Sequence, residues 1–173
     1  MEEAKITLRA ANINDLELLQ HWDEQPHIIA CDPNDDWQWE KELKRDPEWR
    51  EQLIAEIGSR PIGCIQLIDP ALEEEHYWGD VEPNLRAIDI WIGEKENLGK
   101  GYGTKMMRLA LKRCFQGSNV TAVLVEPLAH NTRAHGFYER FGFKFVERRR
   151  FNLDDCFVYR LERIDWEIYL KTL

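Results

Sequence analysis

The sequence predicts one α/β domain over residues 1–173, with a mixed sheet and the element order βα(α)βββαβαββ. Two observations lead to this prediction. Segments that alternate apolar and polar residues, or that are short, apolar and β-branched, recur along the chain and are separated by stretches with helical spacing. The chain also has the length of one domain, 173 residues of which 43% are hydrophobic, without an internal repeat, linker or low-complexity segment.

Local signals place the individual elements. Asn14 or Asp15 is expected to cap the first helix, which ends before Pro26 because the residue before a proline disfavours the helical conformation. Trp39 and Leu43, four residues apart, favour a helix late in an acidic and aromatic segment. The first strand is predicted at 5–11, and two further strands surround the turn 58–61. A surface loop at 70–87 is followed by a strand at 87–93 and a helix that begins at 104. The chain continues with a strand at 120–127, a helix at 131–142 and strands at 143–151 and 156–164.

Composition excludes several classes of function. The formal net charge of −9 argues against binding to nucleic acid, which needs a basic surface, and favours a cationic partner. No apolar run approaches the ~20 residues that a membrane span needs, and the first ten residues do not resemble a signal peptide, so a cytoplasmic protein without membrane contact is expected. The cysteines are far apart and predict packed thiols and no metal site: Cys31, Cys64, Cys114 and Cys156.

A glycine-rich turn follows the strand 87–93. The segment Asn97 to Thr104 reads NLGKGYGT and leads directly into a helix. A strand, a glycine-rich turn and a helix N-terminus together suit an anion, because amide groups converge there and glycine permits close approach. The spacing does not match a nucleoside-triphosphate loop, since Lys100 lies between the glycines, nor the dinucleotide pattern G-x-G-x-x-G. A different phosphate ligand and a turn that merely tolerates glycine both remain open.

Two segments resemble the signatures of the GNAT acetyltransferase superfamily. Residues 98–103 resemble its acyl-coenzyme A loop, Gln/Arg-x-x-Gly-x-Gly/Ala, with Leu98 at the first position as the departure. Residues 126–143 resemble its second signature, in which Asn131 opens a helix and Tyr138 precedes a Gly-Phe turn. The resemblance covers nearly the whole chain. It implies the GNAT fold, with a mostly antiparallel central sheet flanked by helices, and acetyl-CoA as acyl donor.

A narrower resemblance is to the aminoglycoside 6′-N-acetyltransferases and the siderophore-type lysine acyltransferases. It rests on the sequence Ala87-Ile88-Asp89 in the strand before the loop, on the run Leu98 to Thr104, and on the opening strand and helix. Leu98 is ordinary in this subgroup. The resemblance implies direct acetyl transfer, within a ternary complex, to a primary amine of a small cationic acceptor such as an aminoglycoside.

Two residues are candidates for catalysis. Asp89 lies between Ile88 and Ile90, an apolar setting that would raise the pKa of a carboxylate and make it a better base; it could instead anchor the substrate ammonium group or close a hydrogen bond in the strand. Tyr138 is the candidate acid, because a phenol can donate a proton to a departing thiolate; the alternative is a tyrosine that packs beside Phe137.

The resemblance also implies the coenzyme-binding residues. Backbone amides of the turn would bind the pyrophosphate, Lys100 would add charge, and the strand backbone at Ile90 and Ile92 would contact the pantetheine arm. Asn131 would hydrogen-bond the same arm, or cap its helix, or do both. The complete predicted set is Ile90, Ile92, Leu98, Gly99, Lys100, Gly101, Tyr102, Gly103, Thr104 and Asn131.

The acceptor is expected to bind between two acidic segments, 32–40 and 73–82, which contain interleaved aromatic residues. Trp22, Asp36 and Trp78 are the predicted acceptor-binding residues, together with Asp89. Solvated acidic faces are the alternative. The other acceptors kept open are a siderophore precursor and a protein N-terminus or lysine, and a module that binds acyl-CoA without catalysis is the rival from another class. The identity of the acceptor and the choice between monomer and dimer stay open.

Overall fold

The computed structural model describes residue 3 and residues 5–173. Its strands form one seven-stranded sheet in the order β1-β2-β3-β4-β5-β7-β6. Strand β4 pairs with β5 in parallel, whereas β1 with β2, β5 with β7 and β6 with β7 are antiparallel, so the predicted mixed, mostly antiparallel sheet is confirmed. The strands are β1 Ile6–Ala10, β2 Arg50–Ile57, β3 Arg60–Ile68, β4 Leu85–Ile92, β5 Ala122–Val125, β6 Lys144–Phe151 and β7 Asp154–Glu162.

The helices depart from the predicted order in two places. Pro26 begins a further helix instead of only ending one, since proline is tolerated in the first helical turn, and the chain closes with a helix that the sequence did not predict. The helices are η1 Ile13–Asp15, α1 Leu16–Asp23, α2 Pro26–Cys31, α3 Trp39–Glu42, η2 Lys95–Asn97, α4 Tyr102–Gln116, α5 Thr132–Glu139 and α6 Arg163–Leu170. Asp15, one of the two predicted candidates, is the N-cap residue of α1, but its side chain makes no capping hydrogen bond there; Asn12 caps the preceding turn η1 through its side chain.

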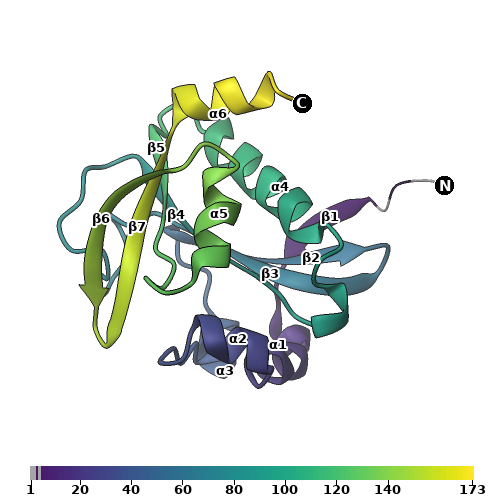
Figure 1. The fold of residues 1–173 in the computed structure, drawn as a ribbon. Coiled ribbons are helices and arrows are strands. Elements are labelled where there is room, and N and C mark those ends of the chain that lie inside the picture. Colours follow the sequence, from purple (N-terminus) through teal and green to yellow (C-terminus); the bar gives the residue numbers. More distant parts are fainter. Residues whose placement is uncertain (1–2, 4) are drawn as a thin grey trace. The chain divides into compact units, whose positions relative to one another are not determined.

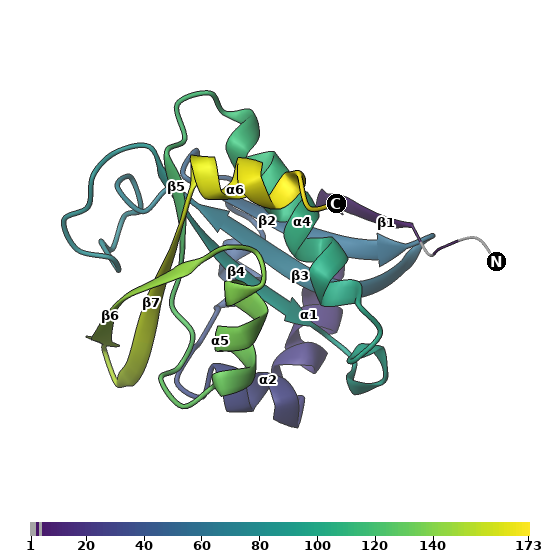
Figure 2. The ribbon, with the colours of Figure 1, turned by 45° about the horizontal axis from the view of Figure 1, so that its top comes forward.

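The chain divides into two compact units, Met1–Leu67 with Asp89–Lys112, and Ile68–Ile88 with Arg113–Leu173. Strand β4 and helix α4 each contribute to both. In the first unit, α1, α2 and α3 lie on one side of β1–β3 and the N-terminal part of α4 lies on the other (Figures 1 and 2). The first unit therefore has three layers, with its strands in the middle.

The core of the first unit is rich in tryptophan. Helix α1 contributes Leu19 and Trp22, both with no exposed surface, to a cluster with residues of α2, α3 and the strands. On the other side of the strands, Met106 of α4 lies so close to Gly63 that a Cβ added there would be 2.6 Å from its Cε. Glycine at this position lets α4 approach β3. The cluster comprises Leu19, Trp22, Ile28, Trp39, Ile54, Cys64 and Trp91.

The second unit contains the long β6–β7 hairpin with α5 beside it and α6 after it (Figure 2). Helix α6 is held by its first residue, Arg163, whose guanidinium donates hydrogen bonds to the carbonyls of Phe115 and Val120. Trp166 of α6 stacks on Phe115 with ring centroids 6.1 Å apart. The apolar cluster of this unit comprises Trp78, Leu85, Ala87, Ala122, Leu124, Leu128, Phe151, Cys156 and Val158.

The cysteines match the predicted packed thiols at three of four positions. Cys64, Cys114 and Cys156 are buried, but Cys31, the last residue of α2, is exposed. The prediction was wrong for Cys31 because the helix that carries it was not expected. Among the described residues, no helix combines the length and the apolar character that crossing a membrane requires.

Candidate active site

The glycine-rich turn lies in the first unit, between η2 and α4. Gly99 and Gly101 have φ values of +72° and +78°, in the left-handed region that other residues avoid. A Cβ added at either position would meet no atom within 4 Å, so these glycines serve the backbone conformation and leave open space above it. The turn ends at Tyr102, the first residue of the 15-residue helix α4, whose first-turn amide groups lack intrahelical acceptors. This arrangement suits an anion.

The strand that leads into the turn is anchored at its end. The carbonyl of Ile92 accepts a hydrogen bond from Nε2 of His27 at 2.8 Å, and the N–H of Gly93 donates to the carbonyl of Ile62 at 3.0 Å. Oε1 of Glu94 accepts from the indole of Trp22 at 3.2 Å. Neither His27 nor Glu94 was predicted as a site residue, because neither belongs to a local motif.

A second anchor lies closer to the glycines. Asn97, the last residue of η2, is buried, and its Oδ1 accepts a hydrogen bond from Arg60 at 3.3 Å. Lys100 and the two glycines beside it are exposed. The turn therefore has fixed ends and an open middle.

Asp89 lies on β4 in the same unit, three residues before Ile92. Burial, and to a smaller extent the negative charge of Asp35, raise the pKa of its carboxyl group to about 7. At neutral pH such a group is divided between its protonated and ionised forms, which suits a general base.

The thiol of Cys64, completely buried on β3, has a pKa raised well above its usual value by burial and by the charge of Asp89, so it is not a nucleophile.

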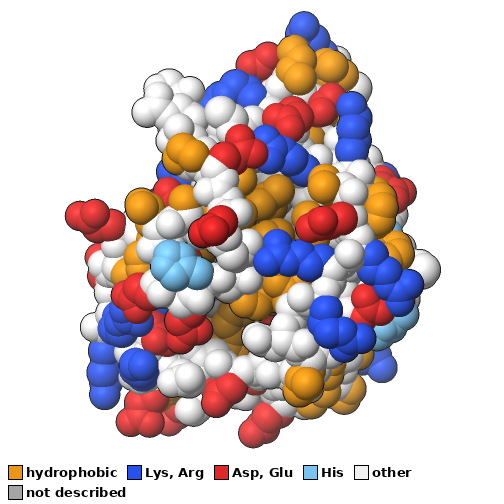
Figure 3. Space-filling model, turned by 90° about the vertical axis from the view of Figure 1, so that its left-hand side faces the viewer, with side chains coloured by type: hydrophobic (Ala, Val, Ile, Leu, Met, Phe, Trp, Pro, Cys, Tyr) orange, Lys and Arg blue, Asp and Glu red, His pale blue; other side chains and the backbone are white. Residues whose placement is uncertain are grey.

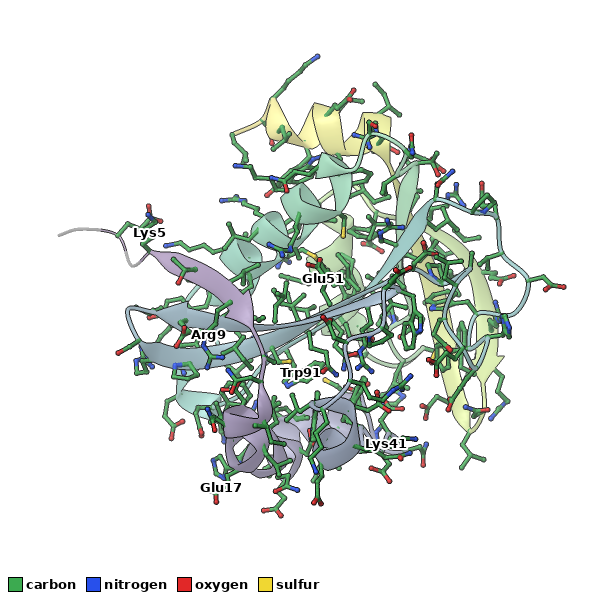
Figure 4. All side chains as sticks on the ribbon, turned by 180° about the vertical axis from the view of Figure 1, so that it is seen from behind. Lys5, Arg9, Glu17, Lys41, Glu51 and Trp91 are labelled. Atoms are coloured by element: carbon green, nitrogen blue, oxygen red, sulfur yellow. The ribbon has the colours of Figure 1, made fainter. Side chains whose placement is uncertain are left out.

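Stacked indole rings lie next to the strands of this unit. Trp37 stacks on Trp39 and on Trp91, with ring centroids 5.8 and 5.3 Å apart. Figure 4 shows Trp91 between the strands of the unit and helices α1–α3. Nε1 of Trp39 donates to Oδ2 of Asp23 at 2.6 Å, whereas Oδ1 of Asp23 and Nε1 of Trp91 are buried without a hydrogen-bond partner among the described residues. Burial raises the pKa of Asp23, and the charges of Asp36, Asp35 and Glu24 add to this effect.

A cavity of about 330 Å³ opens beside Asp23. Three carboxylates line it, and Lys41 supplies the only basic side chain among the described lining residues. Asp36, predicted to bind the acceptor, is exposed, and its Oδ1 accepts a hydrogen bond from the N–H of Gln38 at 3.1 Å. The lining residues are Gln20, Asp23, Asp36, Gln38, Trp39, Glu40 and Lys41.

The predicted stacking of Trp22 and Trp78 on an acceptor does not fit their burial. Trp22 has no exposed surface, and Trp78 is 4% exposed within the apolar cluster of the second unit. Each ring is used in packing, as is usual for large aromatic residues. Tyr77, next to Trp78, is 39% exposed and stacks on Phe151 at 4.9 Å.

Tyr138 lies on helix α5 of the second unit, and Asn131 lies immediately before this helix. Oδ1 of Asn131 accepts a hydrogen bond from the N–H of Ala134 at 3.2 Å, so Asn131 caps this helix, one of the two roles predicted for it. Tyr138 is half-buried, with its ring 5.3 Å from that of Phe137 and 5.6 Å from that of Phe143.

The second predicted acidic segment, 73–82, does not form a uniform acidic surface. Glu73 is buried, and its carboxylate accepts hydrogen bonds from the N–H groups of Glu75 and Tyr77, which shapes the loop. Glu82 forms an ion pair with Arg160 at 2.7 Å. Figure 3 shows acidic and basic side chains intermixed on the face that carries β6.

A mixed seven-stranded sheet with an open glycine turn at the N-terminus of α4 suits an acyltransferase that uses acyl-coenzyme A. The chain belongs to the acetyltransferase (GNAT) domain family, whose model matches residues 12–151. It is therefore an acetyl-CoA-dependent N-acyltransferase. The predicted extent of the domain, residues 1–173, stays a prediction.

Three comparisons with individual proteins agree with this assignment. Aminoglycoside N(6')-acetyltransferase type 1 of Klebsiella pneumoniae is 28% identical over 153 residues, which cover 80% of this chain and 74% of that protein. Lysine N-acyltransferase MbtK of Mycobacterium tuberculosis is 22% identical over 152 residues, covering 80% and 69%. The crystal structure of aminoglycoside acetyltransferase AAC(6')-Ib with coenzyme A and kanamycin has a TM-score of 0.83 at 25% identity, covering 95% of this chain and 98% of that one.

Proposed function

We propose that this protein transfers the acetyl group of acetyl-CoA directly to a primary amine of a small cationic acceptor, an aminoglycoside-like polyamine. The observation that carries the proposal is the carboxyl group of Asp89, whose pKa of about 7 suits deprotonation of an ammonium group near neutral pH. Asp89 lies on the strand that leads to the glycine-rich turn, within one unit of the structure. The description of the Klebsiella pneumoniae relative as an aminoglycoside N(6')-acetyltransferase supports the choice of acceptor.

The turn is proposed to hold the coenzyme. Its two left-handed glycines and the open space above them fit a pyrophosphate bound by backbone amides of Gly99, Gly101, Gly103 and Thr104. Lys100 adds charge, Leu98 precedes the glycines, and Tyr102 lies between Gly101 and Gly103. Acetyl-CoA supplies the acetyl group as a thioester. For the pantetheine arm, backbone at Ile90 is the better candidate, because the carbonyl of Ile92 already accepts a hydrogen bond from His27.

Two side chains are proposed to move protons. The carboxylate of Asp89 accepts the proton of the acceptor ammonium group, either directly or through water, or holds that group in place. The hydroxyl of Tyr138 provides the proton for the departing thiolate, as its place in the second signature implies. Asn131, whose Oδ1 caps α5, is also proposed to hydrogen-bond the coenzyme arm, as its place in the second signature implies.

The acceptor is proposed to be cationic because acidic side chains dominate the cavity of the first unit. Asp23, Asp36 and Glu40 outnumber Lys41 among the charged residues of its lining, and the net charge of −9 would attract a polyamine from solution. Of the acceptor-binding residues predicted from the sequence, Asp36 and Asp89 are retained in this proposal. Trp22 and Trp78 are not.

A lysine-derived acceptor, such as a siderophore precursor, is the second candidate. The match to lysine N-acyltransferase MbtK favours it, and the same base and coenzyme turn would serve. The two candidate acceptors differ in charge, because a lysine side chain carries one ammonium group whereas an aminoglycoside carries several.

A thiol-release assay tests the proposal. The purified protein is mixed with acetyl-CoA and one amine from a panel: kanamycin, ribostamycin, spermidine, Nε-hydroxylysine, lysine and an N-terminal peptide. We expect release with kanamycin and ribostamycin, and loss of release in Asp89→Asn with coenzyme binding retained. Release with the lysine derivatives alone would support the second candidate. Coenzyme binding without release for any amine would indicate a binding module and overturn the proposal.

A further inference from the structure

We propose that His27 is a positioning residue for the coenzyme turn, and that it acts by fixing the peptide group between Ile92 and Gly93. This inference rests on the coenzyme-binding role proposed for the turn. His27 lies on α2, a helix that carries none of the sequence motifs, and its ring contacts β4 just before the chain leaves the strand.

Both hydrogen-bonding groups of this peptide are engaged. Its carbonyl, which belongs to Ile92, accepts from Nε2 of His27 at 2.8 Å. Its N–H, which belongs to Gly93, donates to the carbonyl of Ile62 on β3 at 3.0 Å. Because the two groups of a trans peptide point in opposite directions, the planar unit is held from both sides and cannot rotate without losing both bonds.

The next two residues are held by α1. The ring of Trp22 lies directly over Gly93, where an added Cβ would be 1.9 Å from Cε2 of that ring. Oε1 of Glu94 accepts from Nε1 of Trp22 at 3.2 Å and faces Nε2 of His21 at 3.0 Å. Three consecutive residues, 92–94, are therefore held by side chains of α1 and α2, and the first glycine of the turn follows five residues later.

The bond from His27 does not depend on the charge of the imidazole. A carbonyl oxygen can only accept, so Nε2 must carry a proton, and it does so in one neutral tautomer and in the protonated ring. His27 thus serves as a constant donor. His21 differs from His27 because it is exposed and shares its partner, Oε1 of Glu94, with the indole of Trp22. When the imidazole of His21 is removed, Glu94 therefore still accepts a hydrogen bond from Trp22.

Positioning of this kind contributes to coenzyme affinity. Backbone amides bind a pyrophosphate well only when they already point at it, and the binding free energy otherwise includes the ordering of the turn. Loss of the His27 bond frees one side of the Ile92–Gly93 peptide at the origin of the turn. The effect should appear in the Kd and KM for acetyl-CoA and not in kcat at saturation.

The test compares His27→Phe, which keeps a ring but removes the donor, with His27→Gln, whose side-chain amide can place a donor at a similar reach. His27→Asn, too short to reach Ile92, is the second donor-loss variant if the phenylalanine variant does not fold. His21→Phe is the matched control. Calorimetric titration with acetyl-CoA gives Kd, steady-state assays give KM and kcat, and thermal melting monitors the fold.

We expect the donor-loss variant to raise Kd and KM for acetyl-CoA about five- to tenfold, with kcat within twofold of wild type. His27→Gln and His21→Phe should stay within twofold in all three constants. An unchanged Kd for acetyl-CoA in His27→Phe or His27→Asn, or a lower Tm and kcat without a change in Kd, would overturn the positioning role. Failure of the wild-type protein itself to bind acetyl-CoA would instead overturn the role proposed for the turn, and the inference with it.

Discussion

The indole ring of Trp22 occupies the space that a side chain at position 93 would need. A Cβ built on Gly93 would lie 1.9 Å from Cε2 of Trp22, a ring that has no exposed surface and donates its N–H to Glu94. Neither partner can move aside without disturbing the tryptophan-rich core. Gly93 is therefore required by packing, whereas Gly99 and Gly101 are required by backbone conformation.

The first prediction concerns this contact. Gly93→Ala should lower the free energy of unfolding by roughly 3 kcal/mol or more, because overpacking against a rigid ring forces strain into the core. Chemical denaturation measures the loss. In a Trp22→Leu background the same substitution should cost much less, since the clashing ring is gone. Equal losses in the two backgrounds would show that the ring is not the cause.

The pH dependence of activity should follow Asp89. Its pKa of about 7 predicts that kcat/KM rises with pH through about 7 and then levels off, because only the ionised form is a base. Asp35→Asn removes a neighbouring negative charge and should move the midpoint of this rise to lower pH. Asp89→Asn should lower kcat roughly 100-fold or more and abolish the rise. A midpoint that stays in place in Asp89→Asn would assign the titration to another group.

Asp89 should also make stability depend on pH. A folded-state pKa raised from 3.8 to about 7 means that protonated Asp89 favours the folded state below pH about 4, and that this contribution is lost as pH rises through about 7. Asp89→Asn should therefore raise the free energy of unfolding at pH 8, by on the order of 2 kcal/mol, and change it little at pH 4. Denaturation at the two pH values measures the difference, and an equal effect at both would contradict the predicted linkage.

The glycines of the turn can be tested against a matched glycine elsewhere. Gly101 and Gly58 have φ values of +78° and +61°, and an added Cβ at either position meets no atom within 4 Å. Alanine at either site should cost about 1–2 kcal/mol of stability through backbone strain. Only Gly101→Ala should also weaken acetyl-CoA binding, by about tenfold, because its methyl group enters the ligand space. Titration with acetyl-CoA would contradict this if both variants bound like wild type.

Tyr138→Phe tests the proposed acid. Loss of the hydroxyl group should lower kcat roughly 100-fold with no change in the Kd for acetyl-CoA. Tyr159→Phe is the control, because it also loses one hydroxyl group, the donor to Oε1 of Glu139 at 3.0 Å, and should lower Tm without changing kcat. A parallel decrease of kcat and coenzyme affinity in Tyr138→Phe would make Tyr138 a structural residue.

Features with a local cause were predicted correctly. Asn131 was expected at the start of a helix and caps α5, since an Asn side chain can accept from an amide of the first turn. The turn between β2 and β3 was located from Gly58, which has a positive φ. The order of the strands along the chain followed from alternation and apolar runs.

Features that depend on distant contacts were missed. Helix α6 begins at Arg163, which is held by carbonyls more than 40 residues earlier in the chain, between Phe115 and Val120. Trp22 and Trp78 were expected to stack on an acceptor, but both pack in cores, because burial of an indole depends on which elements meet around it. Neither position carries a local signal of burial.

The sequence by itself determined the family, the glycine turn and the identity of Asp89 as candidate base, because short motifs specify backbone conformations and residue types that are local in the chain. Only the tertiary structure decided how that carboxyl group titrates, which tryptophans are buried and which side chains hold the strand before the turn. A pKa is set by burial and by charges such as Asp35, 54 positions away in sequence. The bond from His27 to Ile92, which joins residues 65 apart, likewise exists only after folding.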